Sequence, residues 1–309
     1  MRKYPYFDTH CDTLTKICRS GSNLKDPDCM VNLKNMRIYR SPVQVFAVFN
    51  EGDLNFGNTA DAFERLKTEC RNNGRFISVA KNSRDVRYNI RQGRASAILS
   101  IEGLGNEINF DISNIEKYKK IGVLFAGLCW NGDNILCGGA GRNLKGMSEL
   151  GLRAIDEMER VGIIADVSHM SEASFWDLAE HCTRPFAATH SGSRHVYNHP
   201  RNLTDAQFTQ LIKTGGVCGI NFYPPFLNDG KCNVDDIVRH IDHFMSLGGE
   251  NNVGIGADFD GIDITPSDVK CSADVYKVFD RLLSINYKES TVNKIAFYNF
   301  YNLINKIEI

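Results

Sequence analysis

The stretch VLFAGLC, residues 123–129, is seven residues long and contains no polar side chain. A strand with one face in solvent alternates polar and apolar residues, whereas a strand covered on both faces is apolar throughout. The stretch therefore predicts a strand that is buried on both sides. Strands of this kind occur in parallel sheets that are covered by helices.

Seven further runs of this kind occur along the chain, with helical patterns between them. The eight predicted strands cover residues 6–10, 43–49, 95–101, 123–129, 162–167, 185–189, 216–222 and 253–257. Helix start signals are also present, since Ser148 precedes apolar residues at three-residue steps and Thr204 begins a capping-box pattern. Eight strands that alternate with helices predict an α/β fold, a closed (β/α)8 TIM barrel, in a single domain over residues 1–309.

The composition limits the classes of partner. The chain has 309 residues and a net charge of −1, with 42% hydrophobic and 24% charged residues, as in soluble globular proteins. It contains no cluster of lysine and arginine, so we expect neither nucleic acid nor a membrane as a partner. The amino-terminal residues MRKYPYFDTH lack the apolar core of a secretory signal, and the last residues, NLINKIEI, lack the tail of a lipid-anchor signal.

The ten cysteines are scattered along the chain and include no C-x-x-C pair. This spacing argues against a zinc finger and against a thioredoxin-type redox site. Several of them, such as Cys129 and Cys218, lie within apolar runs, where a free thiol packs as a small hydrophobic group. We therefore expect reduced thiols and a cytoplasmic location.

Polar residues follow the predicted strands at the positions where a barrel carries its chemistry, the carboxyl ends of the strands. His10 and Asp12 follow the first strand, Glu102 the third, His169 the fifth and His190 the sixth. Each zinc ion takes about four nitrogen, oxygen or sulfur ligands, and a carboxylate can bridge two ions. Any one of these residues alone could be a helix cap or a loop residue. The set of five predicts a two-zinc hydrolytic centre.

Five motifs together resemble those of the membrane dipeptidase family, peptidase family M19. They are D-x-H-x-D, S-I-E-G, D-V-S-H, the run from His190 to Asn202, and G-I-G-x-D-F-D-G, and they occur in the family's order from Asp8 to Gly261. The resemblance implies a (β/α)8 metallo-dipeptidase, a hydrolase that cleaves the peptide bond of free dipeptides through a hydroxide bridging two zinc ions. It also implies the ligands: His10 and Asp12 for one ion, His169 and His190 for the other, and Glu102 between them.

The resemblance implies roles for two further residues. Asp258 matches the acidic residue that acts on the bridging water, and it would pass a proton to the leaving amine. Arg201 matches the arginine that binds the terminal carboxylate of the substrate. A planar guanidinium pairs with a carboxylate through two hydrogen bonds. Fixed beside the metals, it would restrict the enzyme to substrates that end one residue past the scissile bond.

The chain departs from the family pattern at two places. Mammalian members have a histidine after the fourth strand, whereas this chain has Trp130 and Asn131 there, as in bacterial-type relatives. We expect Trp130 to pack, and Asn131 is the candidate for binding substrate in place of that histidine. Near the seventh strand, the sequence YPPF offers Tyr223 or Phe226 for a substrate-binding tyrosine position, and Tyr223 is the candidate.

Two other functions are considered. Amidohydrolase-type barrels that cleave other amides or lactones usually begin with H-x-H and often use a modified lysine as the bridge, whereas this chain has H-x-D and Glu102. A non-catalytic binding barrel would have lost ligands, yet all five are present. Mn²⁺ or Co²⁺ would accept the same ligands as zinc, and a homodimer is left open. His240 and His243, three residues apart in a predicted helix, are expected to face solvent.

Overall fold

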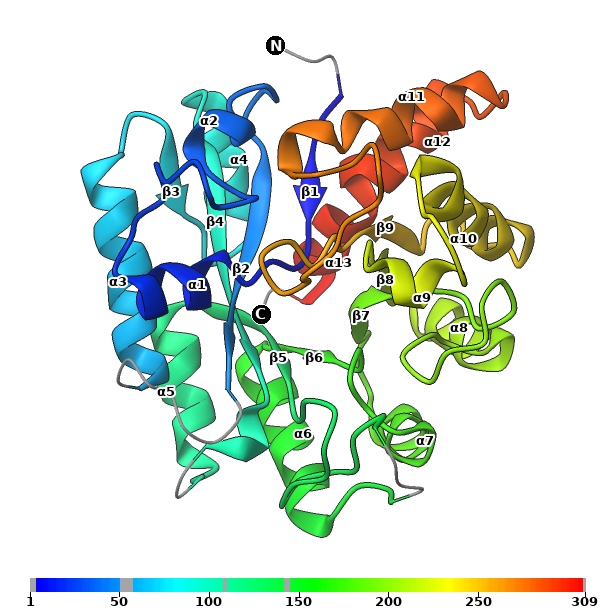
Figure 1. Cartoon of the computed structure of the whole chain (residues 1–309). Helices are drawn as coiled ribbons and strands as arrows, with labels where there is room; N and C mark the ends of the chain where they lie inside the picture. The colour runs from blue at the N-terminus through cyan, green and yellow to red at the C-terminus, as the bar shows by residue number, and fades with distance from the viewer. Residues whose placement is uncertain (1–3, 51–57, 108–109, 142–144, 308–309) are drawn as a thin grey trace.

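The computed structural model describes residues 4–50, 58–107, 110–141 and 145–307 (Figure 1). Eight parallel strands form a closed ring, because β2 pairs with β4 as well as with β1. The predicted (β/α)8 barrel is therefore confirmed. In chain order the strands are β1 (Phe7–Asp8), β2 (Val43–Phe49), β4 (Ala95–Glu102), β5 (Val123–Gly127), β6 (Ile164–Asp166), β7 (Ala187–Ser191), β8 (Val217–Ile220) and β9 (Val253–Ile255).

A ninth strand, β3 (Ile77–Val79), was not predicted. It pairs only with the beginning of β4, next to the point where β5 joins the same strand, and it lies outside the ring. Three residues are too few to produce a recognisable apolar run. Predicted strands also begin too early in places. The strand predicted from residue 162 starts at Ile164, because Gly162 ends the preceding helix with a φ of 78°.

Helices surround the ring, and several begin and end where the sequence predicts. Ser148 caps the first turn of α6, and Thr204 and Gln207 form the capping box of α8. The longer helices are α1 (Thr13–Ser20), α3 (Thr59–Asn72), α4 (Ser83–Arg91), α5 (Ser113–Ile121), α6 (Glu149–Val161), α7 (Glu172–His181), α8 (Asp205–Thr214), α10 (Val234–Ser246), α11 (Tyr276–Ser284) and α13 (Asn299–Ile307). The short ones are α2 (Leu33–Met36), α9 (Pro224–Leu227) and α12 (Glu289–Asn293). Among the described residues, we find no helix with the length and apolarity needed to cross a membrane.

The last segment of the chain closes one end of the barrel. A π-helical turn over residues 294–298 joins α12 to α13, and Phe297 and Phe300 lie 5.8 and 5.9 Å from the ring of Phe7 in β1. The same apolar cluster contains residues at the beginnings of five other strands: Val43, Leu124, Ile164, Ala187 and Val217. The amino-terminal end of the barrel is thus filled with apolar side chains. In barrels of this kind the active site lies at the opposite, carboxyl-terminal end.

Candidate metal centre and active site

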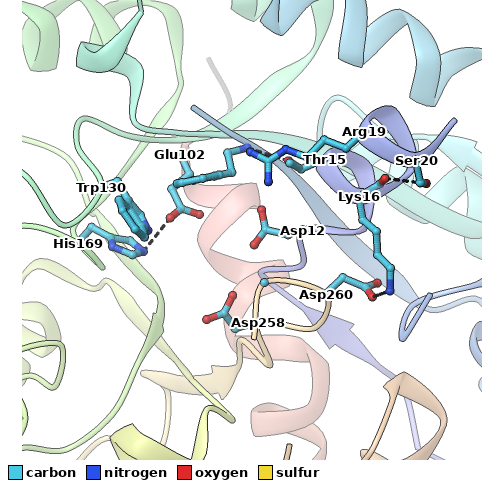
Figure 2. A pocket seen from close by; sticks show the side chains of 12 residues that line it. Asp12, Thr15, Lys16, Arg19, Ser20, Glu102, Trp130, His169, Asp258 and Asp260 are labelled. Atoms are coloured by element: carbon cyan, nitrogen blue, oxygen red, sulfur yellow. Dashed lines mark hydrogen bonds and ion pairs between the residues drawn. The ribbon is translucent and has the colours of Figure 1, made fainter. Parts of the chain in front are cut away.

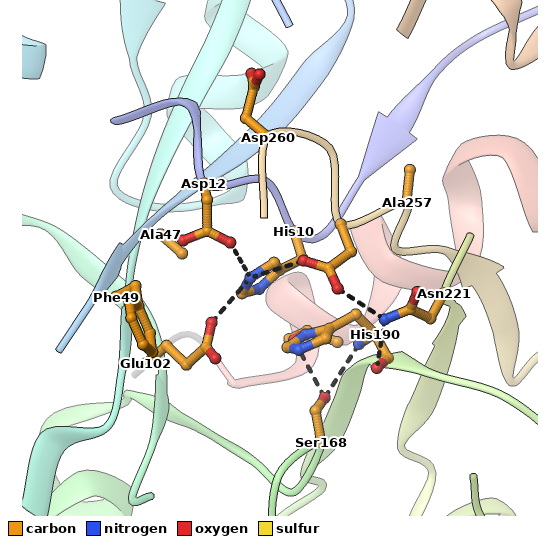
Figure 3. A network of polar contacts seen from close by, with 12 residues as sticks. His10, Asp12, Ala47, Phe49, Glu102, Ser168, His190, Asn221, Ala257 and Asp260 are labelled. Carbon is orange, nitrogen blue, oxygen red and sulfur yellow. Dashed lines mark hydrogen bonds and ion pairs between the residues drawn. The ribbon is translucent and has the colours of Figure 1, made fainter. Parts of the chain in front are cut away.

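Five polar side chains converge at the carboxyl end of the barrel. They extend from four strands: two follow β1, one ends β4, one follows β6 and one lies in β7. Each is at most 9% exposed. They are the five ligands predicted from the sequence, His10, Asp12, Glu102, His169 and His190 (Figure 2 and Figure 3).

Glu102 lies between two groups of ligand atoms. Its Oε2 is 3.0 Å from Nε2 of His10, which in turn is 3.4 Å from Oδ2 of Asp12. Its Oε1 is 2.9 Å from Nε2 of His169, and that nitrogen is 2.8 Å from Nε2 of His190. Each group of three offers atoms within 4.8 Å of one another, as the ligands of a single ion require. One carboxylate thus faces two candidate metal sites.

Hydrogen bonds explain how the first two ligands are held. The extended backbone of β1 continues past its last residue, since the N–H groups of Cys11 and Asp12 donate to the carbonyls of Val45 and Phe259. His10 and Asp12 therefore point to the same side, and Cys11 is buried. Asp12 occupies the N-cap position of α1, yet its side chain makes no cap hydrogen bond. Its carboxylate is turned to His10 instead, so the helix-cap reading of this residue is wrong.

Three buried polar atoms of the cluster make no hydrogen bond of normal geometry among the described residues, although two of them, Nε2 of His10 and Oε2 of Glu102, lie 3.0 Å apart. They are Nε2 of His10, Oε2 of Glu102 and Oδ1 of Asp12. A buried polar or charged atom without a partner costs one to several kcal/mol, and such atoms are rare in native structures. A cation bound among these atoms would remove that cost. The donor set of imidazole nitrogens and carboxylate oxygens suits zinc and its divalent neighbours.

The tautomer of His190 is set by Thr189 and Asp166. Oγ1 of Thr189 lies 2.5 Å from Oδ2 of Asp166 and 2.9 Å from Nδ1 of His190. An ionised carboxylate can only accept, so the hydroxyl donates to Asp166 and accepts the proton on Nδ1. The Nε2 atom of His190 therefore presents a lone pair to the cluster, as a metal ligand must.

Asn131 sets the tautomer of His169. Its Oδ1 lies 3.0 Å from Nδ1 of His169, and an amide oxygen accepts, so Nδ1 carries the proton. The two unprotonated Nε2 atoms of His169 and His190 then lie 2.8 Å apart, and that of His169 also accepts from Nη2 of Arg201. Burial lowers the pKa of His169 to about 4 and that of His190 well below its usual value, so both are in the neutral form that binds metal.

The charges of His10 and Glu102 are set by their neighbours. Burial lowers the pKa of His10, but the carboxylates of Asp12 and Glu102 outweigh burial and raise that pKa well above its usual value. Burial raises the pKa of Glu102, but His169 and His10 outweigh it and hold that pKa well below its usual range. The central carboxylate is therefore ionised, and the cluster has negative charge to offer a cation.

Asp258 follows β9 with its backbone in the left-handed region, at a φ of 64°. Its Oδ2 accepts a hydrogen bond of 2.9 Å from Nδ2 of Asn221, and its Oδ1 lies 3.8 Å from Nε2 of His10. Burial and the carboxylates of Asp12 and Glu102 raise its pKa to about 7. Asn221 directly follows β8, but it was not singled out from the sequence because it lies inside the strand predicted over residues 216–222.

Arg201 is buried beside the second group of ligands, with 5% of its surface exposed. Its Nη2 donates to Nε2 of His169 across 2.8 Å, and its Nε and Nη1 have no partner in the described part of the chain. The ring of Phe226 lies 5.6 Å from the guanidinium carbon. A buried guanidinium with unused N–H groups fits an anion such as a carboxylate. A cation on Nε2 of His169 would replace the hydrogen bond from Nη2 and free that group as well.

A cavity of about 480 Å³ opens beside the cluster (Figure 2). The polar side chains of Asp12, Glu102, His169 and Asp258 form one wall, and α1 forms another. Phe49 and Trp130, whose ring centres are 5.0 Å apart, add an aromatic side. Trp130 was expected only to pack, but it also lines the cavity. The other lining residues are Thr15, Lys16, Arg19, Ser20, Asp260 and Gly261.

A sequence model of the membrane dipeptidase family, peptidase family M19, matches residues 1–309. The chain belongs to this family. An uncharacterized dipeptidase of Schizosaccharomyces pombe is 34% identical over 226 residues, which is 71% of this chain and 54% of that protein. A protein of Klebsiella pneumoniae named as uncharacterized, in the pqqA 5' region, is 31% identical over 230 residues, covering 70% and 84%. A solved M19 metallopeptidase, dipeptidase AC, is 25% identical, with a TM-score of 0.88 over 98% of both chains.

Membership of this family confirms the resemblance seen in the sequence. Two other residues at the carboxyl end of the barrel, Tyr223 and Asp260, are not among the five clustered side chains. The pKa of Tyr223 is raised by burial and by a hydrogen bond to Asp263, and its ring lies edge-on to Phe226 at 4.9 Å. Asp260 accepts hydrogen bonds from Thr13 (2.5 Å) and Lys16 (2.8 Å). Its side chain points away from the histidines and anchors α1 (Figure 3).

His240 and His243 lie outside the cluster, and the sequence predicted that both face solvent. In the structure their surroundings differ. His240 is fully buried, where its Nδ1 accepts from the backbone N–H of Ser193 at 2.8 Å and its Nε2 lies 3.2 Å from the carbonyl of Leu227. The expectation that it faces solvent is wrong. His243 lies 2.8 Å from Oδ1 of Asp205, near the surface. A buried histidine that joins a loop to a helix leaves no periodic signal in the sequence.

Proposed function

We propose that this family member is a zinc-dependent dipeptidase that hydrolyses free dipeptides. The observation that carries the proposal is the position of Glu102, whose two oxygens face two separate groups of ligand atoms. The first group would hold one ion through His10 and Asp12, and the second would hold another through His169 and His190. The buried atoms of the first group that make no hydrogen bond, and the close approach of two acceptor nitrogens in the second, support this assignment.

Bound at these positions, two divalent ions would polarise the scissile carbonyl and lower the pKa of a water molecule toward neutrality. The protein would supply the proton transfer through Asp258. Because Asn221 holds its Oδ2, the carboxylate has a fixed orientation and its Oδ1 remains available. In this role it accepts a proton from the attacking water and gives it to the amine that leaves.

Arg201 would supply the selectivity for dipeptides. Its side chain is buried and is held against His169, so its distance from the cluster cannot change freely. A substrate whose terminal carboxylate pairs with this guanidinium places the preceding peptide bond near the ligands. In a longer peptide the chain continues past the residue that follows this bond, so a peptide group rather than a carboxylate would lie beside Arg201. This arrangement gives a physical reason for cleavage of free dipeptides.

Metal analysis combined with a dipeptide panel tests the proposal. We expect about two zinc ions per chain, release of free amino acids by the zinc-loaded protein, loss of release after chelation, and recovery when zinc is restored. Glu102→Gln replaces one ligand oxygen with an amide nitrogen and should lower the zinc content, whereas the exposed Glu149→Gln should not. A zinc-loaded protein that cleaves none of the dipeptides would refute the proposed activity.

A further inference from the structure

The cavity extends from the ligand cluster along α1. Four residues of this helix line it, at the spacing that places side chains on one face of a helix. They are Thr15, Lys16, Arg19 and Ser20, with Asp12 just before the helix. The wall formed by α1 therefore carries two positive charges, one from Lys16 and one from Arg19. Figure 2 shows the side chain of Arg19 reaching back from the end of α1 over the cavity.

The two charges are not equivalent. Nζ of Lys16 lies 2.8 Å from Oδ1 of Asp260 and donates to the carbonyl of Asp28 at 2.6 Å. Its charge is already compensated by a buried carboxylate. Within the part of the chain that the structure describes, Arg19 has neither an ion pair nor a hydrogen bond, and its guanidinium carbon lies 5.7 Å from the ring of Phe49. Its charge is therefore available to a ligand in the cavity.

Placement at the end of a helix would explain a cation on any face of α1, because the carboxyl end of a helix favours positive charge. That effect does not require Arg19 to line the cavity or to lie against Phe49. Nor does it explain why Arg19 is left unpaired while Lys16, one turn earlier, is paired. The position of Arg19 thus calls for an additional explanation.

The direction of the substrate follows from the two arginines, and this step rests on the proposed function. Arg201 would hold the carboxyl-terminal residue on the His169 side of the cluster. The residue that donates the scissile carbonyl then extends the other way, into the cavity. Its side chain meets Phe49, Trp130 and the guanidinium of Arg19.

We propose that Arg19 selects dipeptides whose amino-terminal residue has an acidic side chain. The aromatic side formed by Phe49 and Trp130 suits the methylene groups of glutamate or aspartate. The guanidinium beyond it pairs with their carboxylate, and charge-assisted hydrogen bonds of this kind are among the stronger polar contacts. Four carboxylates also line the cavity. Those of Asp12, Glu102 and Asp258 lie within 3.8 Å of Nε2 of His10, and that of Asp260 is paired with Lys16.

The test compares substrates that differ only in charge. We expect the zinc-loaded protein to cleave Glu-Ala with a kcat/KM at least about fivefold higher than Gln-Ala, its neutral isostere. The ratio should fall to about one in Arg19→Ala, and in Arg19→Glu it should drop below one while Lys-Ala gains over Gln-Ala. Arg91→Ala is the matched control, since Arg91 also lies exposed in the last turn of its helix, α4. It should keep the ratio of wild type.

The outcomes separate this inference from the proposed function. Cleavage of Gln-Ala and Glu-Ala at equal rates by wild type would overturn the role of Arg19 and leave the dipeptidase activity intact. A preference for Glu-Ala that survives Arg19→Ala would likewise overturn it. Failure to cleave any dipeptide would refute the activity itself. Because an exposed ion pair is screened by salt, the expected ratio should also shrink when ionic strength is raised well above about 0.1 M.

Discussion

The side-chain oxygen of Asn131 lies 3.0 Å from Nδ1 of His169. The backbone of Asn131 is itself fixed, because its carbonyl accepts from Gly141 at 2.8 Å and a Cβ on Gly139 would come within 2.6 Å of it. Asn131, expected from the sequence to bind substrate, therefore contacts His169, a proposed metal ligand. Loss of such a partner typically weakens metal binding 10- to 100-fold.

We accordingly predict that Asn131→Ala weakens zinc binding by about that factor, measured by competition with a chelator. Asn131→Asp keeps an oxygen that can accept from Nδ1, so it should lose much less affinity. Gly139→Ala should resemble Asn131→Ala, because the added methyl displaces the backbone of Asn131. Unchanged zinc affinity in Asn131→Ala would show that His169 needs no such support.

The unused N–H groups of Arg201 lead to a prediction about substrate form. Arg201→Ala should raise the KM of free dipeptides by roughly 10- to 100-fold, since a charge-assisted contact contributes about 1.5–3 kcal/mol. Dipeptides with an amidated carboxyl end lack the partner and should be affected little. Arg91→Ala is the control, because Arg91 is an exposed arginine in the last turn of α4. Equal losses on free and amidated substrates would mean that Arg201 is structural.

The backbone of Asp258 makes one substitution informative. Its φ of 64° suits asparagine, which tolerates the left-handed region, better than alanine. Asp258→Asn also keeps an oxygen for the hydrogen bond from Asn221. We expect this variant to fold and to retain zinc, but to lose about 10²- to 10⁴-fold in kcat because the amide cannot carry the proton. Turnover near that of wild type would remove the assigned role.

The sequence predicted the ring of strands and the clustering of the five polar side chains for one reason. Strands that are covered on both faces are apolar throughout, so the first polar residue after each run, such as Glu102 after β4, marks the end of the barrel where ligands gather. The signal was lost where a strand was very short, as for β3. It also could not give the exact strand ends, which depend on hydrogen bonds to neighbouring strands.

The supporting residues could not be predicted, because their partners lie far away along the chain. Thr189 lies within a predicted strand, yet its role depends on the carboxylate of Asp166, 23 residues earlier. Asn221 is recognised only by its contact with Asp258, 37 residues later. Helical periodicity places His240 near a polar face, but its partners come from a loop and a short helix. Such contacts are properties of the folded barrel rather than of local pattern.

His240 gives a prediction for stability. Burial lowers its pKa to about 4 from an ordinary value of 6.5, so the unfolded chain binds a proton more readily than the folded chain between these values. Its contribution to stability is complete above pH 6.5 and is lost as the pH falls toward 4. Between pH 7.5 and 5 this amounts to about 2 kcal/mol. His240→Asn keeps an acceptor for Ser193 but does not titrate in this range. When the pH is lowered from 7.5 to 5, the free energy of unfolding of this variant, measured by urea denaturation, should therefore fall by about 2 kcal/mol less than that of wild type. Parallel pH profiles for the two proteins would contradict this assignment.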